Sequence, residues 1–346
     1  MVVCGTVTAT NNSIERVSIS TDGNESNYNC EEPSISVDGR YIVFSSYADN
    51  LVSDDNNGYN DIFVHDNTLN ITERVSISST GIESDGNSYK PAISDDGRFV
   101  VFVSHATNLV EIDTNDVSDI FVYDRLLKQI ERVNLAVNGE QANSYSSEPS
   151  ISGDGNYVVF TSWASNLVEN DTNEWGDVFV CNRITGTLER VSISSSGDEQ
   201  VMPPNSIIHV DYEPSISGDG RFIAFTSYAE NLVDGDNNNC QDIFLYDRIL
   251  KITKRISVSS DGQEATGTSE NPAISSNGLY IVFTSNAGNL VENDDNPWND
   301  IFVHDIETGF TEKVSIFTSE ETISRNPSIS GDGRFITFET TKGGQT

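Results

Sequence analysis

A Pro-Ser-Ile-Ser or Pro-Ala-Ile-Ser segment recurs six times along the chain and constrains its fold more than any other feature. The copies begin at Pro33, Pro91, Pro149, Pro214, Pro272 and Pro327, so the steps between them are 58, 58, 65, 58 and 55 residues. A segment that returns at a nearly constant spacing of this size indicates a repeat architecture. The 346 residues are therefore expected to fold as a series of similar units.

Each unit carries the same four short stretches of β-forming residues. In the first unit they are Pro33 to Ser36, Tyr41 to Ser46, Asp61 to Asp66, and Glu73 to Ser78. An Asp-Gly or Asn-Gly pair follows the first stretch in all six units, which is typical of a tight hairpin. No stretch shows helical periodicity. The sequence therefore predicts an all-β fold, a six-bladed β-propeller made of four-stranded antiparallel blades.

The whole chain, residues 1–346, is expected to form this single propeller. Five blades are expected at residues 33–80, 91–138, 149–196, 214–261 and 272–318. The sixth unit stops after its second strand, and residues 1–20 offer the missing part. Ser13 to Ser20 matches the fourth-strand segment Thr187 to Ser194, and Val2 to Cys4 fits the third-strand position of Phe179 to Cys181. Residues 327–340 plus 1–20 are thus expected to build and close the sixth blade.

Phenylalanine occupies one fixed position in the second strands and one in the third strands. The second-strand set is Phe44, Phe102, Phe160, Phe225, Phe283 and Phe338, and the third-strand set is Phe63, Phe121, Phe179, Phe244 and Phe302. Large apolar rings at matched positions of every unit are expected to pack blade against blade and to fill the core.

The run that leads into the second strand resembles the TolB-type propeller repeat, whose hallmark is Pro-Ser-x-Ser-x-Asp-Gly-Arg before an apolar strand. Pro214 to Phe225 and Pro327 to Phe335 carry it most fully. The chain departs from the usual pattern in having Ile where Trp is common, and in lacking the Arg at Asn156 and Leu279. The resemblance covers essentially the whole chain. It implies the propeller fold and leaves the activity open, since the family includes protein-binding modules and similar repeats occur in some enzymes.

Acidic residues outnumber basic residues by 54 to 19, which gives a formal net charge of −35. Nucleic acid is excluded as an expected partner, because phosphate binding needs a basic stripe. No run of about 18 apolar residues occurs, so no membrane insertion is expected, and no signal peptide is evident in this chain. Such an excess of charge favours bound cations or high salt, although a solvated acidic surface is the plain alternative.

Five units place an Asp-x-Asn-x-x-x-Asp motif directly before the third strand, while the residues between the three polar positions vary. The five triads are Asp55, Asn57 and Asp61; Asp113, Asn115 and Asp119; Asp171, Asn173 and Asp177; Asp236, Asn238 and Asp242; and Asp294, Asn296 and Asp300. Side chains that stay fixed among varying neighbours are candidate ligands.

Oxygen ligands without His or Cys suit Ca²⁺ and argue against zinc or copper. The spacing is similar to the opening of a calcium loop but lacks a closing Glu at position 12, so modest affinity is expected at up to five sites. The alternative is that Asp and Asn form Asx turns that begin the third strand.

No catalytic machinery is legible, and the chain is not expected to be an enzyme. His65 and His304 share one repeat position with tyrosine and cysteine, which is typical of packing residues. His209 is the one histidine in an irregular place, within the longer segment Ser195 to Glu213. No Gly-x-Ser-x-Gly, His-Glu-x-x-His or P-loop motif occurs. The four cysteines show no CxxC spacing, and their pairing stays open.

These observations favour a non-catalytic, calcium-binding propeller that acts outside the cell or at its surface as a binding or structural module. Extracellular calcium is high enough to fill weak sites. A protein or glycan partner is expected on the face that bears the acidic loops, where Tyr59, Trp175 and Trp298 lie at loop tips. Two alternatives remain: a subunit of a self-assembling extracellular filament, and a polysaccharide lyase or hydrolase with its site at the top of the channel.

Overall fold

Every regular element that the structure describes is a β-strand. The computed structural model describes residues 5–8, 13–203, 212–294, 296–316 and 322–342. Among these residues there is no helix, and hence no helix that could cross a membrane. The predicted all-β class is confirmed.

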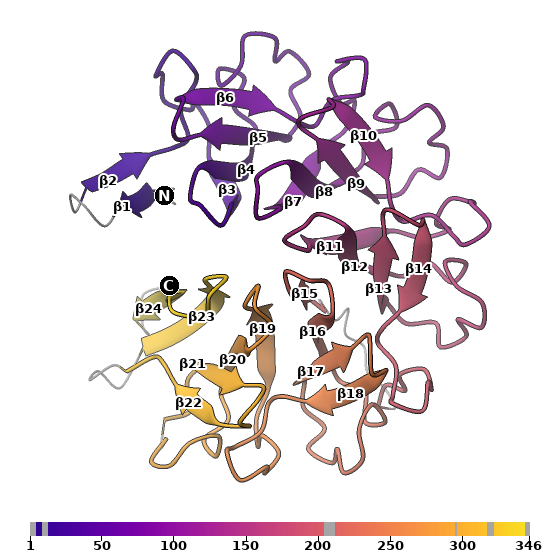
Figure 1. Ribbon diagram of the computed structural model, residues 1–346, viewed down its shortest axis with the longest axis vertical. Coiled ribbons are helices and arrows are strands. Elements are labelled where there is room, and N and C mark those ends of the chain that lie inside the picture. Colours follow the sequence, from indigo (N-terminus) through magenta and orange to yellow (C-terminus); the bar gives the residue numbers. More distant parts are fainter. Residues whose placement is uncertain (1–4, 9–12, 204–211, 295, 317–321, 343–346) are drawn as a thin grey trace. The chain divides into compact units, whose positions relative to one another are not determined.

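Most strands form four-stranded antiparallel sheets whose strands follow one another in chain order (Figure 1). The first sheet contains β3 (Cys30–Ile35), β4 (Tyr41–Ser46), β5 (Asp61–Asp66) and β6 (Ile71–Arg74). The second contains β7 (Ser88–Ile93), β8 (Phe99–Ser104), β9 (Asp119–Asp124) and β10 (Gln129–Arg132). The third contains β11 (Ser146–Ile151), β12 (Tyr157–Ser162), β13 (Asp177–Asn182) and β14 (Thr187–Arg190).

Two further sheets of the same kind follow. The fourth contains β15 (Ser215–Ile216), β16 (Phe222–Ser227), β17 (Asp242–Asp247) and β18 (Ile252–Arg255). The fifth contains β19 (Ser269–Ile274), β20 (Tyr280–Ser285), β21 (Asp300–Asp305) and β22 (Thr311–Lys313). The described residues thus hold five four-stranded sheets, which match the five expected blades.

The chain divides into two compact units. Unit 1 comprises Met1–Glu169 and Cys181–Leu188, and unit 2 comprises Asn170–Val180 and Glu189–Thr346. Unit 1 includes the first and second sheets, and unit 2 includes the fourth and fifth. The boundary runs through the strands of the third sheet.

Two strands of the first sheet differ at both ends from the predicted stretches: β3 is Cys30–Ile35 and not Pro33 to Ser36, and β6 is Ile71–Arg74 and not Glu73 to Ser78. The first strand begins at Cys30, three residues before Pro33, because it contains a bulge between Glu31 and Ser34 that lets the ladder continue past the proline. The fourth strand ends at Arg74 and not at Ser78. There the Ser76 hydroxyl accepts the Ile62 N–H at 3.0 Å in place of a backbone carbonyl, so the regular ladder stops.

The predicted phenylalanine core is confirmed in the five four-stranded sheets, whereas Phe338 of β24 is only half-buried. The two rings of a sheet lie next to each other, as for Phe44 and Phe63, whose centroids are 6.0 Å apart, and both are fully buried. Within unit 1, Phe102 and Phe121 of the second sheet pack with Val43 and Ile62 of the first in one apolar cluster. The second sheet thus buries its aromatic face against the aliphatic face of the first, and in unit 2 Phe283 and Phe302 of the fifth sheet pack likewise with Ile243 and Leu245 of the fourth.

The two ends of the described chain form two-stranded sheets. β1 (Gly5–Thr8) pairs with β2 (Ser13–Arg16), and β23 (Thr322–Ile329) pairs with β24 (Ile336–Lys342). Ser13 to Arg16 is thus a strand, as predicted for a fourth-strand segment.

The residues at the third-strand position of this hairpin differ from those predicted. Gly5 lies opposite Arg16, as Phe63 lies opposite Arg74, so Gly5 to Val7 occupies the position that the sequence assigned to Val2 to Cys4. Four residues separate β1 from β2, as four separate β5 from β6, so the two pairs have the same register. Val2 to Cys4 itself lies outside the described residues.

Candidate functional site

The acidic motif forms a compact turn before the third strand, and its central asparagine joins the two ends. In the first loop, Asn57 Oδ1 accepts the backbone N–H of Tyr59 at 2.9 Å, which is an Asx turn. Its Nδ2 donates to Asp61 Oδ2 at 2.9 Å. The amide therefore presents an N–H, and not an oxygen, to the carboxylate. The same Asn-to-Asp bond is made by Asn115, Asn173, Asn238 and Asn296.

The aspartate that opens the third strand is the centre of each loop. Asp61 is fully buried. Besides Asn57, it accepts hydrogen bonds from the hydroxyls of Ser76 and Ser84. Ser76 follows the end of the fourth strand and also accepts the N–H of Ile62 in the third strand. This one serine therefore links the buried carboxylate to both strands. The corresponding donors to the other strand aspartates are Asn134, Ser192, Ser257 and Ser315.

A basic side chain from the fourth strand lies among the carboxylates of each loop. Arg74 Nη1 is 3.1 Å from Asp55 Oδ1, 3.4 Å from Asp61 Oδ2 and 2.9 Å from Glu83 Oε1. Its side chain is only 4% exposed. Arg132, Arg190, Arg255 and Lys313 hold the same place in the other four loops. The structure thus brings the first and last aspartates of each triad together through a cation that the sequence reasoning did not include.

The third carboxylate of the cluster comes from the connection to the next sheet. Glu83 forms a short β-bridge with Ile77, and its Oε1 accepts the Asn56 N–H at 2.8 Å. Glu199 and Glu264 hold this position in the third and fourth loops, and Gln141 holds it in the second. A carboxylate or amide recurs nine residues after each of these arginines. This nine-residue spacing is the sequence signal that could have identified the third carboxylate, which the Asp-x-Asn-x-x-x-Asp motif does not contain.

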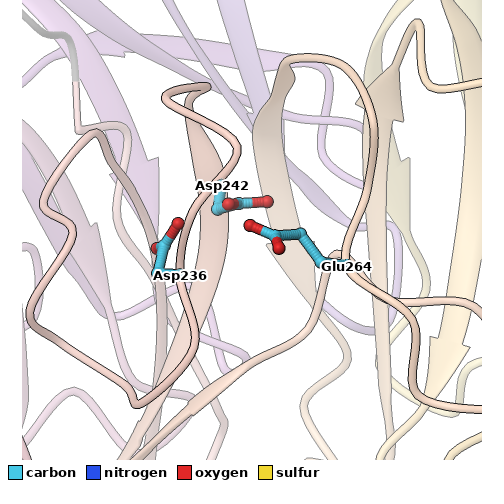
Figure 2. A group of neighbouring side chains, drawn as sticks. All are labelled: Asp236, Asp242 and Glu264. Carbon is cyan, nitrogen blue, oxygen red and sulfur yellow. The ribbon is translucent and has the colours of Figure 1, made fainter.

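The carboxylates converge most closely in the fourth loop. One oxygen each from Asp236, Asp242 and Glu264 lies within 4.8 Å of the others, and Figure 2 shows the three groups turned toward a common point. Arg255 Nη1 is 3.3 Å from Asp236 and 3.1 Å from Glu264, but 3.7 Å from Asp242. This is the longest separation between arginine and strand aspartate among the four arginine-containing loops.

These clusters carry more negative than positive charge. Three carboxylates face one guanidinium in the first, third and fourth loops, which leaves two negative charges in each without a counter-charge. Burial raises the pKa of Asp236 to about 7, and the charge of Asp242 adds to the shift while Arg255 opposes it. Burial likewise raises the pKa of Asp55 to about 6, with a further contribution from Asp61. The pKa values of Asp177 and Asp242 are also raised to about 6, mainly by burial.

The longer segment Ser195 to Glu213 is not only a surface feature. Gln200 is fully buried and its Nε2 donates to Asp177 Oδ1 at 3.0 Å and to the Tyr212 hydroxyl at 3.1 Å. Tyr212 is 1% exposed. Residues 204–211, including His209, lie outside the described residues. Both described ends of the segment therefore belong to the third acidic cluster.

The described histidines are engaged in hydrogen bonds or in ring contacts. His65 Nδ1 lies 2.9 Å from Thr72 Oγ1, and His304 Nδ1 lies 2.9 Å from Thr311 Oγ1. Both rings are buried, and burial lowers the pKa of each. The ring of His105 contacts Tyr89 edge-on.

The described cysteines are unpaired. Cys30 and Cys181 are buried and Cys240 is half-buried, while Cys4 lies outside the described residues. Burial raises the pKa of Cys181 to about 11, which makes this thiol a poor nucleophile.

Comparisons with known proteins identify the fold. No protein-family model matches the chain, and no curated protein matches its sequence. The putative TolB from Agrobacterium tumefaciens is 15% identical with a TM-score of 0.53, over 95% of this chain and 94% of that one. The β-propeller domain of the Trilobed protease from Pyrococcus furiosus is 12% identical with a TM-score of 0.54, over 92% of this chain and 79% of that one.

TolB from Acinetobacter baumannii is 18% identical with a TM-score of 0.47, and the match covers 82% of this chain and 55% of that one. The chain therefore spans little more than half the length of that protein. The fold is that of TolB-like β-propellers, as the sequence resemblance implied. Because the similar structures include a domain of a protease beside TolB proteins, the fold does not decide the activity.

Replacing the cation of one cluster tests how far these loops depend on it. Arg74→Met leaves Asp55, Asp61 and Glu83 without their guanidinium and should lower the free energy of unfolding by about 3–5 kcal/mol in calcium-free buffer. Arg40→Met is the control, because the Arg40 side chain that pairs with Asp66 is 35% exposed and solvent screens this pair, so its loss should destabilise the protein less. Urea unfolding measures both. Equal losses in the two variants would contradict the central role of the buried cation.

The raised carboxyl pKa values predict how stability changes with pH. The native state holds protons on groups such as Asp236 that the unfolded chain has already lost, so calcium-free protein should become less stable between about pH 4 and pH 7. Thermal melts in EDTA measure this decline. Asp236→Asn should reduce the slope, whereas Asp234→Asn, at an exposed position of the same loop, should leave it unchanged. A slope that responds equally to both variants would indicate general charge repulsion instead.

Proposed function

We propose that this chain is a non-catalytic β-propeller module that binds calcium in its acidic loops and acts outside the cell as a binding or structural part. The observation that carries the proposal is the convergence of Asp236, Asp242 and Glu264 around one point with a single guanidinium to balance them. Two uncompensated charges in a partly buried cluster match the charge of one divalent cation.

The chemistry of the donor set agrees with calcium. Carboxylate oxygens are the ligands that Ca²⁺ prefers, and the described clusters contain no His or Cys that would favour zinc or copper. The ligand set differs from the Asp-Asn-Asp triad of the motif, because Asn238 donates its N–H to Asp242 and the third carboxylate is Glu264. Calcium would share these carboxylates with Arg255, which supports a modest affinity.

The charged residues in each of the five clusters distinguish the loops that are suited to bind calcium from those that are not. The clusters of Asp55, Asp171 and Asp236 each hold two aspartates, a glutamate and an arginine. In the second loop Gln141 replaces the glutamate, so one negative charge is absent. In the fifth loop Lys313 lies 2.9 Å from Asp294 and 2.6 Å from Asp300. We therefore propose binding at the first, third and fourth loops, in place of the five sites expected from the motif.

Weak calcium sites support an extracellular role. Millimolar affinity is typical of extracellular modules, whereas cytosolic calcium would leave such sites empty. The binding role rests on the loop-bearing ends of the sheets, where exposed tyrosines accompany the acidic residues. A non-catalytic role is favoured by the described histidines, which are engaged in packing and hydrogen bonding as described above.

Calcium should stabilise the protein at the proposed clusters. Millimolar Ca²⁺ should raise the Tm by several degrees above that in EDTA, because a ligand bound to the native state alone stabilises it. Glu264→Gln should reduce the increase, and Gln141→Glu, which recreates the full set in the second loop, should enlarge it. Asp234→Asn is the control with the same change of charge as Glu264→Gln. An identical Tm with calcium and with EDTA in the unmodified protein would rule out the calcium sites.

The two-stranded sheets at the ends of the chain are candidate halves of a sixth blade. β1–β2 and β23–β24 each supply half of the strand set of a complete sheet, and an exposed sheet edge favours pairing. We propose that together they form a sixth blade, within one chain in a monomer or between copies in a filament.

Deleting residues 1–20 tests this closure. Loss of the first hairpin should abolish cooperative thermal unfolding in a monomer and in a filament alike, because both need the donated strands. Calorimetry measures cooperativity, and gel filtration with electron microscopy of the intact protein separates the two assemblies. A truncated protein that melts sharply as a monomer would refute the shared blade.

A further inference from the structure

A cluster of exposed tyrosines lies in unit 1 where the first strands begin and the second strands end. Tyr28 precedes β3 and Tyr47 follows β4, and their side chains are 62% and 44% exposed. The ring centroids are 5.8 Å apart and the ring planes are inclined by 58°. Both rings therefore offer exposed surface to a ligand. We call Tyr28, Tyr47, Tyr89, Glu31 and Glu32 the tyrosine patch.

The loop that carries Tyr28 is held in place by polar contacts. Asn27 donates its backbone N–H to Asn50 Oδ1 at 3.0 Å and its Nδ2 to Asp49 Oδ1 at 2.6 Å. The Ser26 hydroxyl donates to the carbonyl of Tyr28 at 2.7 Å. The ring is therefore positioned before any ligand arrives, which lowers the entropy cost of binding.

The next sheet extends the patch. Tyr89 of β7 is half-buried, and burial raises the pKa of its hydroxyl, with smaller contributions from Tyr47 and Glu32. Its ring contacts His105 at a centroid distance of 6.0 Å. The second sheet thus contributes an aromatic pair of its own.

Carboxylates accompany these rings. Glu31 and Glu32 are exposed, and no salt bridge to either occurs within the described ranges. Glu32 adopts a φ of 54° at the bulge of β3, an uncommon conformation for this residue, and its Oε2 accepts the Lys90 N–H at 2.7 Å. The ammonium of Lys90 is paired with Glu148 instead. The patch therefore combines ring faces with carboxylates that lack a cation.

We infer that the tyrosine patch binds lysine or arginine side chains of a basic segment of a partner protein. A cation over an aromatic face gains from the ring quadrupole, and an adjacent carboxylate adds charge attraction. The net charge of −35 steers basic partners toward the surface and disfavours anionic ones. A neutral glycan could stack on the rings but would leave Glu31 without a counter-charge. This inference rests on the proposed binding role and specifies its partner.

Fluorescence anisotropy with a fluorescein-labelled oligolysine peptide tests the inference in the calcium-loaded full chain at physiological salt. The double variant Tyr28→Ala/Tyr47→Ala keeps the charge of the protein and should weaken binding about tenfold. Tyr28→Phe/Tyr47→Phe keeps the rings and should bind like the unmodified protein. Phe310→Ala removes an exposed ring of the fifth sheet that lies outside the patch and the acidic loops, and this control should have no effect.

Two results would overturn the inference. One is equal peptide affinity of the unmodified protein and the Tyr28→Ala/Tyr47→Ala variant, which would show attraction by net charge alone. The other is binding of a neutral β-glucan that depends on the two rings while the peptide fails to bind. Calcium stabilisation is measured on the same samples. If it persists when peptide binding fails, the partner assignment is wrong and the calcium proposal still stands.

Discussion

A buried carboxylate at the start of each third strand is the feature on which the rest of each sheet depends. Asp61 and its four counterparts are removed from water, and a buried charge is tolerated only when it is hydrogen-bonded and paired. Meeting that requirement in the first sheet engages Asn57 of the preceding loop, Arg74 of the fourth strand and Ser76 just beyond that strand. One charge thus ties together the turn, the outer strand and the connection to the next sheet.

The arrangement leaves a surplus of negative charge that the protein alone does not neutralise. In the first, third and fourth loops one guanidinium faces three carboxylates, and the pKa of Asp236 rises to about 7 as a result of burial and repulsion. Protons or a divalent cation can remove this surplus. We propose calcium for that role, so that the module is most stable where calcium is abundant.

Much of the fold could be predicted from the sequence because its determinants are local. The strands Tyr41 to Ser46 and Asp61 to Asp66 have the predicted bounds, and repetition of Phe44 in every unit marked the core before any contact was known. The site was predicted only in part. Arg74 and Glu83 lie 13 and 22 residues beyond Asp61, so only the folded sheet shows that they meet. The orientation of the Asn57 amide depends on a backbone N–H that a motif does not reveal.

Isothermal titration of the protein with calcium near pH 6.5, repeated in buffers of different ionisation enthalpy, tests the central claim most directly. Carboxyl groups with pKa values of about 6 to 7, as at Asp55 and Asp236, must lose their protons when they bind a cation. The account predicts calcium binding with net proton release that falls toward zero at about pH 8. Calcium binding without proton release near pH 6.5, or no binding at all, would contradict it.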